Sequence, residues 1–450
     1  MDRARIAEIV FDVAKAAGAD AEAYVTAQKE TNVEVKQGEV EKFSFAGSKG
    51  LGVRVIREGR MGYAYTSDFA EASVRRCAEQ ALALAEAADA DAFRKLPEPD
   101  SRPIREPLDN YDAAMETLPA EEKVAFAIGV EKAVLEADER VVMALWSRYL
   151  DGVADVFLAT TKGFKGNYKQ SFAGGIVMAI AADGDERAVS FGVGVDNSIH
   201  KLDPQKIGRE AGERAARLLG GKPVPTQEAT IVYSPFAATD VIGAMSRAMT
   251  AEAMQKNRSF LHGKLGQDVA SDMVTLLDNG RMPGGLATRP FDDEGVPTGA
   301  TRLINEGVLE AVIYDTYTAA KEGTESTGNA SRNSHREPPQ LAPSNFYLQP
   351  GNVTPEELIA DVKQGLYVVN TMNTHSINPV SGDYSVSAQG FWIEDGKLTY
   401  PVNEVTIAIP LDKLLKNVKG VADDLLFLPF MGAIGSPTFR VDGVMIGGQD

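Results

Sequence analysis

Three short polar clusters carry the groups in this chain that could take part in chemistry. They are Asp292-Asp293-Glu294-Gly295, the run STGNASRNSH from Ser326 to His335, and Ser381-Gly382-Asp383-Tyr384. Glycine, asparagine and serine are typical of turns, where a carboxylate usually accepts hydrogen bonds from nearby backbone N–H groups. The same groups could instead line a cleft and bind the backbone of an extended peptide. The residue types alone leave both roles open.

The four histidines do not form a metal-binding motif. His200 ends a strand-rich segment, His262 follows a predicted helix, and His335 and His375 lie in separate predicted loops. None has a second histidine at the spacing that two ligands on one helix require, although His335 and His375 could meet in space. The chain also lacks the G-x-S-x-G, G-x-x-x-x-G-K-[ST] and G-x-G-x-x-G motifs.

The order of predicted elements indicates an α+β protein in three parts. Residues 1–108 read as helix, strands and helix, and residues 109–225 repeat this order, which indicates duplicated N-terminal units. Residues 226–450 form a β-rich C-terminal domain. Proline-rich linkers at Leu96–Pro107 and Lys222–Pro225 separate these parts.

Several local signals position the elements. Asp68 with Glu71 predicts a capped helix start, and Asp203, Ser234 and Thr354, each followed by proline, predict three more. The helix that begins at Ser234 is expected to run to about residue 256. Strands are expected over Val33–Phe45 and Leu51–Thr66, with a turn at Glu58-Gly59 inside the second.

The stretch Gly365–Pro410 is the clearest strand-forming region. It predicts three strands, Leu366–Met372, Tyr384–Ile393 and Leu398–Ile409, with a tight hairpin turn at Asp395-Gly396. Along the third strand the large residues lie at even-numbered positions first and at odd-numbered positions later. This change requires a bulge near Asn403. Two final strands, 438–441 and 444–446, are expected to join at Asp442-Gly443.

Composition limits the partners and the compartment. The net charge of −18 opposes contact with nucleic acid, whose binding depends on lysine and arginine. The longest apolar run, Gly174–Ala182, is too short to cross a membrane. The N-terminus shows no signal peptide, and the single cysteine, Cys77, lies on the apolar stripe of a helix as a buried thiol. These features favour a reducing cytoplasm.

The C-terminal stretch resembles the TldD/PmbA family, specifically its PmbA (TldE) branch. Gly382-Asp383-Tyr384-Ser385, Gly390-Phe391-Trp392 and Tyr400-Pro401-Val402 stand in register with a segment of that branch. The resemblance covers most of the chain from about Gln227 and, more loosely, the part before it. It favours the cleft interpretation, in which these residues bind an extended peptide substrate: Asp292, Asp293, Glu294, Asn329, Arg332, His335 and Asp383.

The resemblance also bears on metal binding, because TldD-type members are metalloproteases with H-E-x-x-x-H on a helix. The matching helix here, Val241–Lys256, has no histidine, and Glu252 is its only acid. The later region that supplies a cysteine in TldD-like members reads LPFMGAIGSPTF here and has none. We therefore expect no catalytic residue, no metal and no cofactor in this chain, with zinc in a TldD-like partner.

The leading hypothesis is a non-catalytic subunit of a cytoplasmic TldD/TldE-type metallopeptidase that acts on unfolded or ribosomally made peptides. The partner would be a TldD-like catalytic chain, and the chain alone could form a homodimer. One alternative is an autonomous hydrolase with metal ligands from scattered residues such as Asp293, His335 and Asp383. The other is a homodimeric regulatory binding protein without a proteolytic partner.

Overall fold

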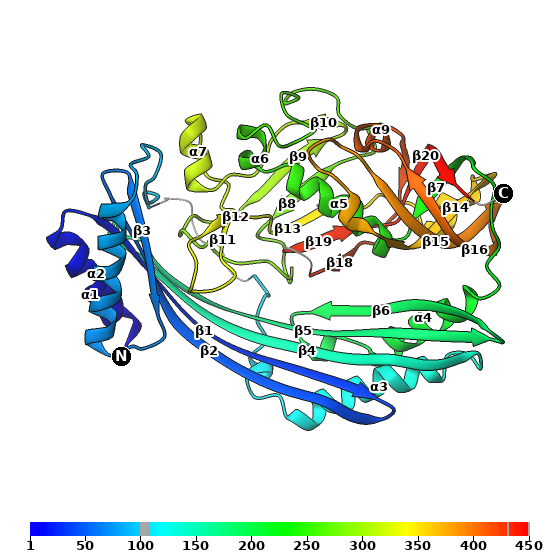
Figure 1. Cartoon of the computed structure of the whole chain (residues 1–450), viewed down its shortest axis with the longest axis horizontal. Helices are drawn as coiled ribbons and strands as arrows, with labels where there is room; N and C mark the ends of the chain where they lie inside the picture. Colours follow the sequence, from blue (N-terminus) through cyan, green and yellow to red (C-terminus); the bar gives the residue numbers. More distant parts are fainter. Residues whose placement is uncertain (100–107, 430–431, 449–450) are drawn as a thin grey trace.

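The computed structural model describes residues 1–99, 108–429 and 432–448. Figure 1 shows a long curved sheet from the N-terminal half and a β-rich body from the C-terminal half, which lies over the concave face of that sheet. The predicted α+β class is confirmed. The expected linker Leu96–Pro107 falls mostly outside the described residues. No helix in the described ranges is long and apolar enough to cross a bilayer.

The N-terminal half forms one antiparallel sheet with the strand order β3-β2-β1-β4-β5-β6. Its strands are β1 (Asp20–Lys36), β2 (Glu39–Arg57), β3 (Arg60–Thr66), β4 (Val141–Thr160), β5 (Lys165–Asp183) and β6 (Glu186–Asp196). β1 and β4 pair from Glu22 opposite Thr160 to Val35 opposite Ser147. The two predicted helix–strands–helix units therefore contribute to one sheet. The strand order of the second unit, β4-β5-β6 from the centre outward, mirrors the order β1-β2-β3 of the first.

Helices cover the face of this sheet that points away from the C-terminal body. They are α1 (Arg3–Ala16), α2 (Glu71–Ala87), α3 (Ala120–Leu135) and α4 (Pro204–Arg217), with short 3-10 turns η1 (Ala113–Glu116) and η2 (Ile199–Lys201). Alternate residues of β1 point to them: Val25 packs with the α1 and α2 side chains, and Val33 packs with α3. Cys77 is buried in the same layer, as predicted, and burial raises the pKa of its thiol to about 12.

Two N-terminal predictions need correction. The strand expected over Val33–Phe45 is the end of β1 and the start of β2, which meet at a turn with φ of 56° at Gln37 and 75° at Gly38. β1 itself begins at Asp20, because Ala21–Thr26 is buried on both faces and shows no alternation of polar and apolar residues. Asp68 is not the N-cap of α2, since that position belongs to Ala70. The Asp68 carboxylate instead accepts hydrogen bonds from Ala70 N at 2.9 Å and Ser73 Oγ at 2.6 Å.

The C-terminal body contains two six-stranded sheets and a small two-stranded one. The first sheet has the order β16-β15-β14-β7-β20-β17, and β16 also pairs with β20, so this sheet closes on itself. Its strands are β7 (Gln227–Tyr233), β14 (Gln364–Met372), β15 (Ser385–Glu394), β16 (Lys397–Ala408), β17 (Val418–Val421) and β20 (Phe439–Gly447). Trp392, Tyr233 and Phe439 are fully buried in its core.

The second sheet has the order β10-β9-β8-β13-β19-β18. Its strands are β8 (Leu276–Asn279), β9 (Ala300–Asn305), β10 (Val308–Leu309), β13 (Asn345–Leu348), β18 (Leu426–Leu428) and β19 (Ala433–Ser436). The pair β11 (Ala330–Ser331) and β12 (Gln340–Leu341) stands apart. The helices are α5 (Pro235–Ala248), α6 (Ala251–Gln255), α7 (Thr316–Glu322), α8 (Pro355–Ala360) and α9 (Leu411–Lys416), with a 3-10 turn η3 (Thr374–Ser376).

The local signals of the C-terminal half are largely confirmed. The three strands predicted in Gly365–Pro410 are β14, β15 and β16, and Asp395 and Gly396 form the turn with φ of 46° and 75°. The predicted bulge lies at Asn403-Glu404, because Val402 pairs with Gly390 and Val405 pairs with Ala388. Thr354 caps α8 in a capping box.

Two C-terminal predictions are wrong in detail. Asp442-Gly443 is not a hairpin turn but a bulge inside the single strand β20, since Val441 and Val444 both pair with β7. Thr230 Oγ1 donates a 2.9 Å hydrogen bond to Asp442 Oδ1 and holds the bulge against that strand. The helix expected to end near residue 256 is interrupted, because Thr250 caps the new helix α6.

Gly390 provides a test of the closed sheet. A Cβ atom at this bulge would lie 1.8 Å from the backbone oxygen of Tyr367 on β14. We expect Gly390→Ala to lower the free energy of unfolding by on the order of 3 kcal/mol, because backbone must move to admit the methyl group. Gly299→Ala is the control, since nothing lies within 4 Å of its added carbon. Equal denaturation midpoints for the two variants would contradict this packing.

Candidate functional site

A buried ion network joins the concave face of the N-terminal sheet to the C-terminal body. Arg54, on β2, donates hydrogen bonds from Nη2 to Glu22 Oε2 at 2.5 Å and from Nη1 to Glu294 Oε1 at 2.6 Å. Glu22 lies on β1, whereas Glu294 belongs to the first predicted polar cluster. All three side chains are at most 4% exposed. One predicted site residue, Glu294, is therefore part of an internal contact between the two halves.

Arg332 extends this network from the second polar cluster. Its guanidinium pairs with Glu22 and lies 4.5 Å from the ring centroid of Tyr24. Its backbone N–H donates to Asp293 Oδ2 at 2.7 Å, and Arg289 Nη1 donates to the same oxygen at 3.1 Å. Asp293 and Arg332 are thus brought together against the sheet.

His335 packs against the same face. Its carbonyl accepts a 2.8 Å hydrogen bond from Tyr63 Oη, and its ring lies over Gly50 with an edge contact to Tyr65. A Cβ atom on Gly50 would clash with the imidazole, so the glycine makes room for it. Burial holds the pKa of His335 below its ordinary value. These contacts make His335 a packing residue between the C-terminal body and the sheet.

Asp292 acts within its own turn. Its Oδ1 accepts hydrogen bonds from the backbone of Glu294 at 2.9 Å and Val296 at 3.0 Å, and its Oδ2 accepts one from Ala330 at 3.0 Å. Burial and the neighbouring Glu294 carboxylate raise the pKa of Asp292 to about 7. Asp292 therefore caps backbone N–H groups around its own turn, which is one of the two roles that the residue types allow.

Asn329 belongs to a separate buried network around Asp278 on β8. Its Nδ2 donates to Asp278 Oδ2 at 2.6 Å, and Ser344 donates its N–H to Oδ1 at 2.7 Å and its hydroxyl to Oδ2 at 2.9 Å. Burial raises the pKa of Asp278 to about 6. Asp278 was missed in the sequence because a lone acid in a short strand carries no motif.

The third polar cluster does not join the other two. Asp383 accepts a 2.5 Å hydrogen bond from Ser381 Oγ, and its carbonyl accepts one from Asn378 N, so these contacts stay within its own loop. His375 lies beside α5, far in the fold from the Gly50 and Tyr65 neighbours of His335. The expectation that His335 and His375 could meet is therefore wrong.

A polar hollow of about 210 Å³ remains between the sheet and the body. Tyr24, Gln28 and Gln170 of the sheet face Asp293 and Arg332 across it. Asp293 Oδ1 and Arg332 Nε are buried and have no hydrogen-bond partner among the described residues. Both residues line the hollow, but these two atoms are themselves enclosed by protein.

A second hollow of about 400 Å³ lies beside α5, within the segment where the resemblance led us to look for a metal-binding helix. It is lined by α5, η3 and β19, through Thr239, Asp240, Gly243, Ser246, Arg247, Thr374, His375, Ile377 and Ile434. Burial raises the pKa of Asp240, and its carboxylate accepts a hydrogen bond from Thr371. Among the described residues that line the hollow, only Asp240 and His375 have metal-binding side chains, and the described part of the chain holds no group of three His, Cys, Asp or Glu that could bind a metal. These residues do not fit a zinc site.

The central arginine of the ion network gives a direct test. Arg54→Met leaves Glu22 and Glu294 buried without this cation, so we expect a loss of about 3–5 kcal/mol in the free energy of unfolding. Arg57→Met is the matched control, because Arg57 lies on the same strand and pairs with Glu86 at the surface. The control should cost less than about 1 kcal/mol. Similar losses for both variants in chemical denaturation would refute the role of Arg54.

Asp278 predicts a pH dependence of stability. Its folded-state pKa of about 6 lies above the ordinary value of 3.8, so the folded chain binds this proton more readily than the unfolded chain. The resulting stabilisation is complete below about pH 4 and is lost as pH rises through about 6. The stability of the wild type relative to Asp278→Asn should therefore fall by on the order of 2 kcal/mol between these limits. A difference that is constant with pH would show that Asp278 does not titrate as described.

Known proteins share this architecture along almost the whole chain. Three domain models of one family match, described as PmbA/TldA metallopeptidase domain 1 (residues 21–85), central domain (115–219) and C-terminal domain (226–448). A metalloprotease PmbA homolog of Haemophilus influenzae is 28% identical, over 92% of this chain and 90% of its own length.

Solved structures agree. A Thermotoga maritima protein, described as a candidate modulator of a DNA gyrase, has a TM-score of 0.90 at 27% identity, and the match covers 98% of this chain and 99% of that one. TldE from Thermococcus kodakarensis has the same fold, with a TM-score of 0.91 at 23% identity and 98% of both chains covered. This chain belongs to the TldD/PmbA family, as its C-terminal motifs indicated.

Proposed function

We propose that this chain is the non-catalytic, TldE-like subunit of a cytoplasmic TldD/TldE-type metallopeptidase that acts on unfolded or ribosomally made peptides. A TldD-like partner would supply the zinc and the catalytic residues. The observation that carries the proposal is the composition of α5 and α6, the segment that matches the metal-binding helix of TldD-type members.

The side chains of this segment are unsuited to zinc proteolysis. Two histidines one turn apart would reach one metal, and a glutamate between them would activate the bound water. Here the segment has no histidine, and its one glutamate, Glu252, pairs with Lys256 at 2.5 Å on the exposed surface. Thr250 also caps a new helix in the middle of the segment, so the side chains do not follow one continuous helical face.

The polar hollow supports a role in holding peptide. A peptide group has one N–H donor and one C=O acceptor. Asp293 Oδ1 can accept from that N–H, and Arg332 Nε can donate to that C=O, provided that a side-chain movement first opens these two atoms, which are enclosed in the single chain. Backbone contacts of this kind bind extended peptides with little regard to sequence. Among the predicted substrate-binding residues, we therefore assign this role to Asp293 and Arg332.

The autonomous hydrolase is less well supported. It requires side chains such as Asp293, His335 and Asp383 to meet around one metal. Asp293 is paired with Arg289, His335 packs against Gly50, and Asp383 lies in a separate loop. A homodimeric binding protein differs from the proposed subunit in one respect, which is the absence of a TldD-like partner in the same organism.

Reconstitution tests the proposal. The purified chain should contain almost no zinc by elemental mass spectrometry and should not cleave unfolded peptide. Mixed with the TldD-like chain of the same organism, it should form one complex by light scattering, and cleavage should then appear. A partner whose two motif histidines are changed to alanine should still assemble but leave the peptide intact. One zinc per isolated chain with cleavage, or two separate species after mixing, would overturn the proposal.

A further inference from the structure

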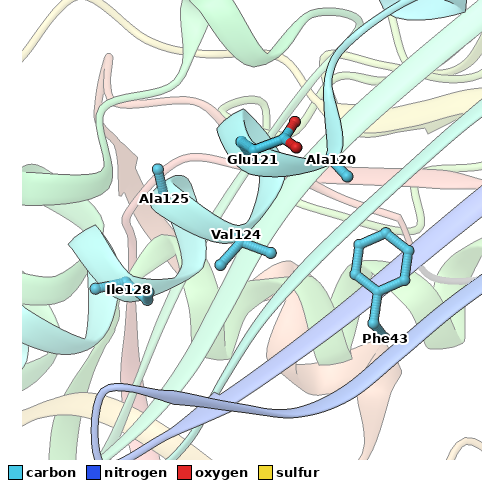
Figure 2. Close-up of a pocket in the computed structure, with 6 residues that line it drawn as sticks. All are labelled: Phe43, Ala120, Glu121, Val124, Ala125 and Ile128. Carbon is cyan, nitrogen blue, oxygen red and sulfur yellow. The ribbon is translucent and has the colours of Figure 1, made fainter.

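Two hollows of the molecule differ in the charges that line them. The groove of about 570 Å³ between Phe43 and α3, shown in Figure 2, has apolar walls and one acid, Glu121. The hollow of about 400 Å³ beside α5, which we call the α5 hollow, has the acid Asp240 together with Arg247 and His375. A ligand with a negative charge would therefore find no cation in the groove, but an arginine in the α5 hollow.

The Arg247 guanidinium is available for such a ligand. Arg247 is exposed, and its guanidinium makes no ion pair or hydrogen bond with another residue in the described ranges. The His375 ring is also exposed and has no hydrogen bond to any residue that the structure describes. Arg332 of the polar hollow differs, since it is already paired with Glu22. A ligand in the α5 hollow can therefore take this cation without breaking a contact within the protein.

Helix α5 places three of the lining residues on one face. Asp240, Gly243 and Arg247 follow one another at intervals of three and four residues, which brings them to the same side of a helix. The helical rise separates the first and last by about 10 Å along the axis. A Cβ atom on Gly243 would meet nothing within 4 Å, so the space between the two charged residues is open. An extended chain would cover this distance with about three residues.

Asp240 supplies a hydrogen-bond acceptor at the other end of this face. Its Oδ2 accepts a hydrogen bond from Thr371 Oγ1. Its Oδ1 has no partner among the described residues and, unlike Asp293 Oδ1, is not enclosed by protein. This oxygen can therefore accept a hydrogen bond from the N–H of a bound peptide group.

The remaining walls of the α5 hollow suit an apolar side chain. Ile377, which follows η3, and Ile434 of β19 both line the hollow. Both isoleucines are buried, so their positions are fixed by the packing around them. Binding sites for small ligands typically combine such apolar walls with a few polar groups that set the orientation.

We propose that the α5 hollow binds the C-terminal carboxylate of a peptide whose last residue is apolar. The Arg247 guanidinium pairs with the carboxylate, and His375 lies at the same hollow as a second donor. Asp240 Oδ1 accepts an N–H from the preceding part of the peptide. The last side chain lies over Gly243 and against the two isoleucines. This inference deepens the proposed role in holding peptide and rests on it.

The surroundings of Arg247 favour a carboxylate over a phosphate. Arg247 lies in the last turn of α5, where the partial negative charge of the helix end opposes a multiply charged anion. The Asp240 carboxylate in the same hollow opposes it as well. One guanidinium is enough for a carboxylate, because the two groups form a pair of parallel hydrogen bonds. A singly charged peptide end with an N–H donor nearby therefore matches both charged ends of the hollow.

Peptide binding to the full-length chain alone tests this assignment. The probe is a short unstructured peptide that ends in leucine and carries a fluorescent label at its N-terminus, prepared both as the C-terminal acid and as the C-terminal amide. By fluorescence anisotropy, the acid should bind about tenfold more tightly than the amide, because only the acid forms charge-assisted hydrogen bonds with arginine. Equal affinities for the two peptides, or no binding of either, would overturn the proposal.

Two variants locate the preference within the chain. Arg247→Gln should lower the affinity for the acid to that for the amide and leave the amide unchanged. Arg258→Gln is the matched control, because Arg258 is also exposed and does not line the hollow. Gly243→Leu should weaken binding of both peptides, since its side chain extends into the open space while leucine favours the helix. A preference for the acid that survives Arg247→Gln would place the site elsewhere and refute the assignment.

A third peptide separates a terminal carboxylate from a side-chain one. The amide of the same peptide with glutamate in place of leucine should bind no better than the leucine amide, because its charge lies where the hollow takes an apolar group. Tight binding of this amide would mean that the hollow recognises acidic side chains and would contradict the proposal.

The outcome is distinguishable from that of the reconstitution experiment. A complex that assembles and cleaves, but whose TldE-like chain binds acid and amide equally, would leave the proposed function standing and overturn this inference. A chain that prefers the acid through Arg247 but fails to assemble with a TldD-like partner would support the binding site and contradict the proposed function.

Discussion

The arrangement of the two halves depends on the neutralisation of buried charge at one place. Arg54 lies between Glu22 and Glu294, and Arg332 makes a second contact with Glu22. The body buries Glu294 with a counterion from the sheet, Arg54, because a carboxylate without a counterion is strongly disfavoured inside a protein, and Glu22 of the sheet takes a second counterion from the body, Arg332. Each half therefore contributes a cation to an acid of the other half. Because an ion pair requires a defined distance between its charges, these contacts restrict where the body can lie on the concave face more than apolar contacts would.

The local parts of the fold could be predicted because their causes are local. Asp395-Gly396 supplies the positive φ angles of a hairpin turn, and Thr354 with Glu357 satisfies the first N–H groups of α8. The bulge at Asn403 was visible as a change of parity within one strand. The first part of β1 was missed because both of its faces are buried, and that depends on segments hundreds of residues away.

The polar clusters were recognised as important, but their roles depend on tertiary contacts. Asp292, Glu294 and His335 are used inside the molecule, as a cap, an ion-pair partner and a packing group. Asp293 and Arg332 share that interior and line a hollow, and each has one enclosed polar atom without a hydrogen-bond partner among the described residues. No sequence pattern separates these two groups, because the distinction arises from which residues of β1 and β2 lie opposite each of them. Family membership, by contrast, was readable from the C-terminal motifs alone.

The seam between β1 and β4 has a consequence for synthesis of the chain on the ribosome. β2 follows β1 at once and can form a hairpin with it early, but β4 reaches β1 only after residues 141–160 have emerged. Until then the long inner edge of β1 is exposed, although in the finished protein it lies at the centre of the sheet. An exposed edge of this kind can pair with a strand of another chain until its own partner strand is available. Because β4 of the second unit covers the inner edge of β1, it protects the first unit from aggregation. Until residues 141–160 have been synthesised, the nascent chain is prone to aggregate at this edge.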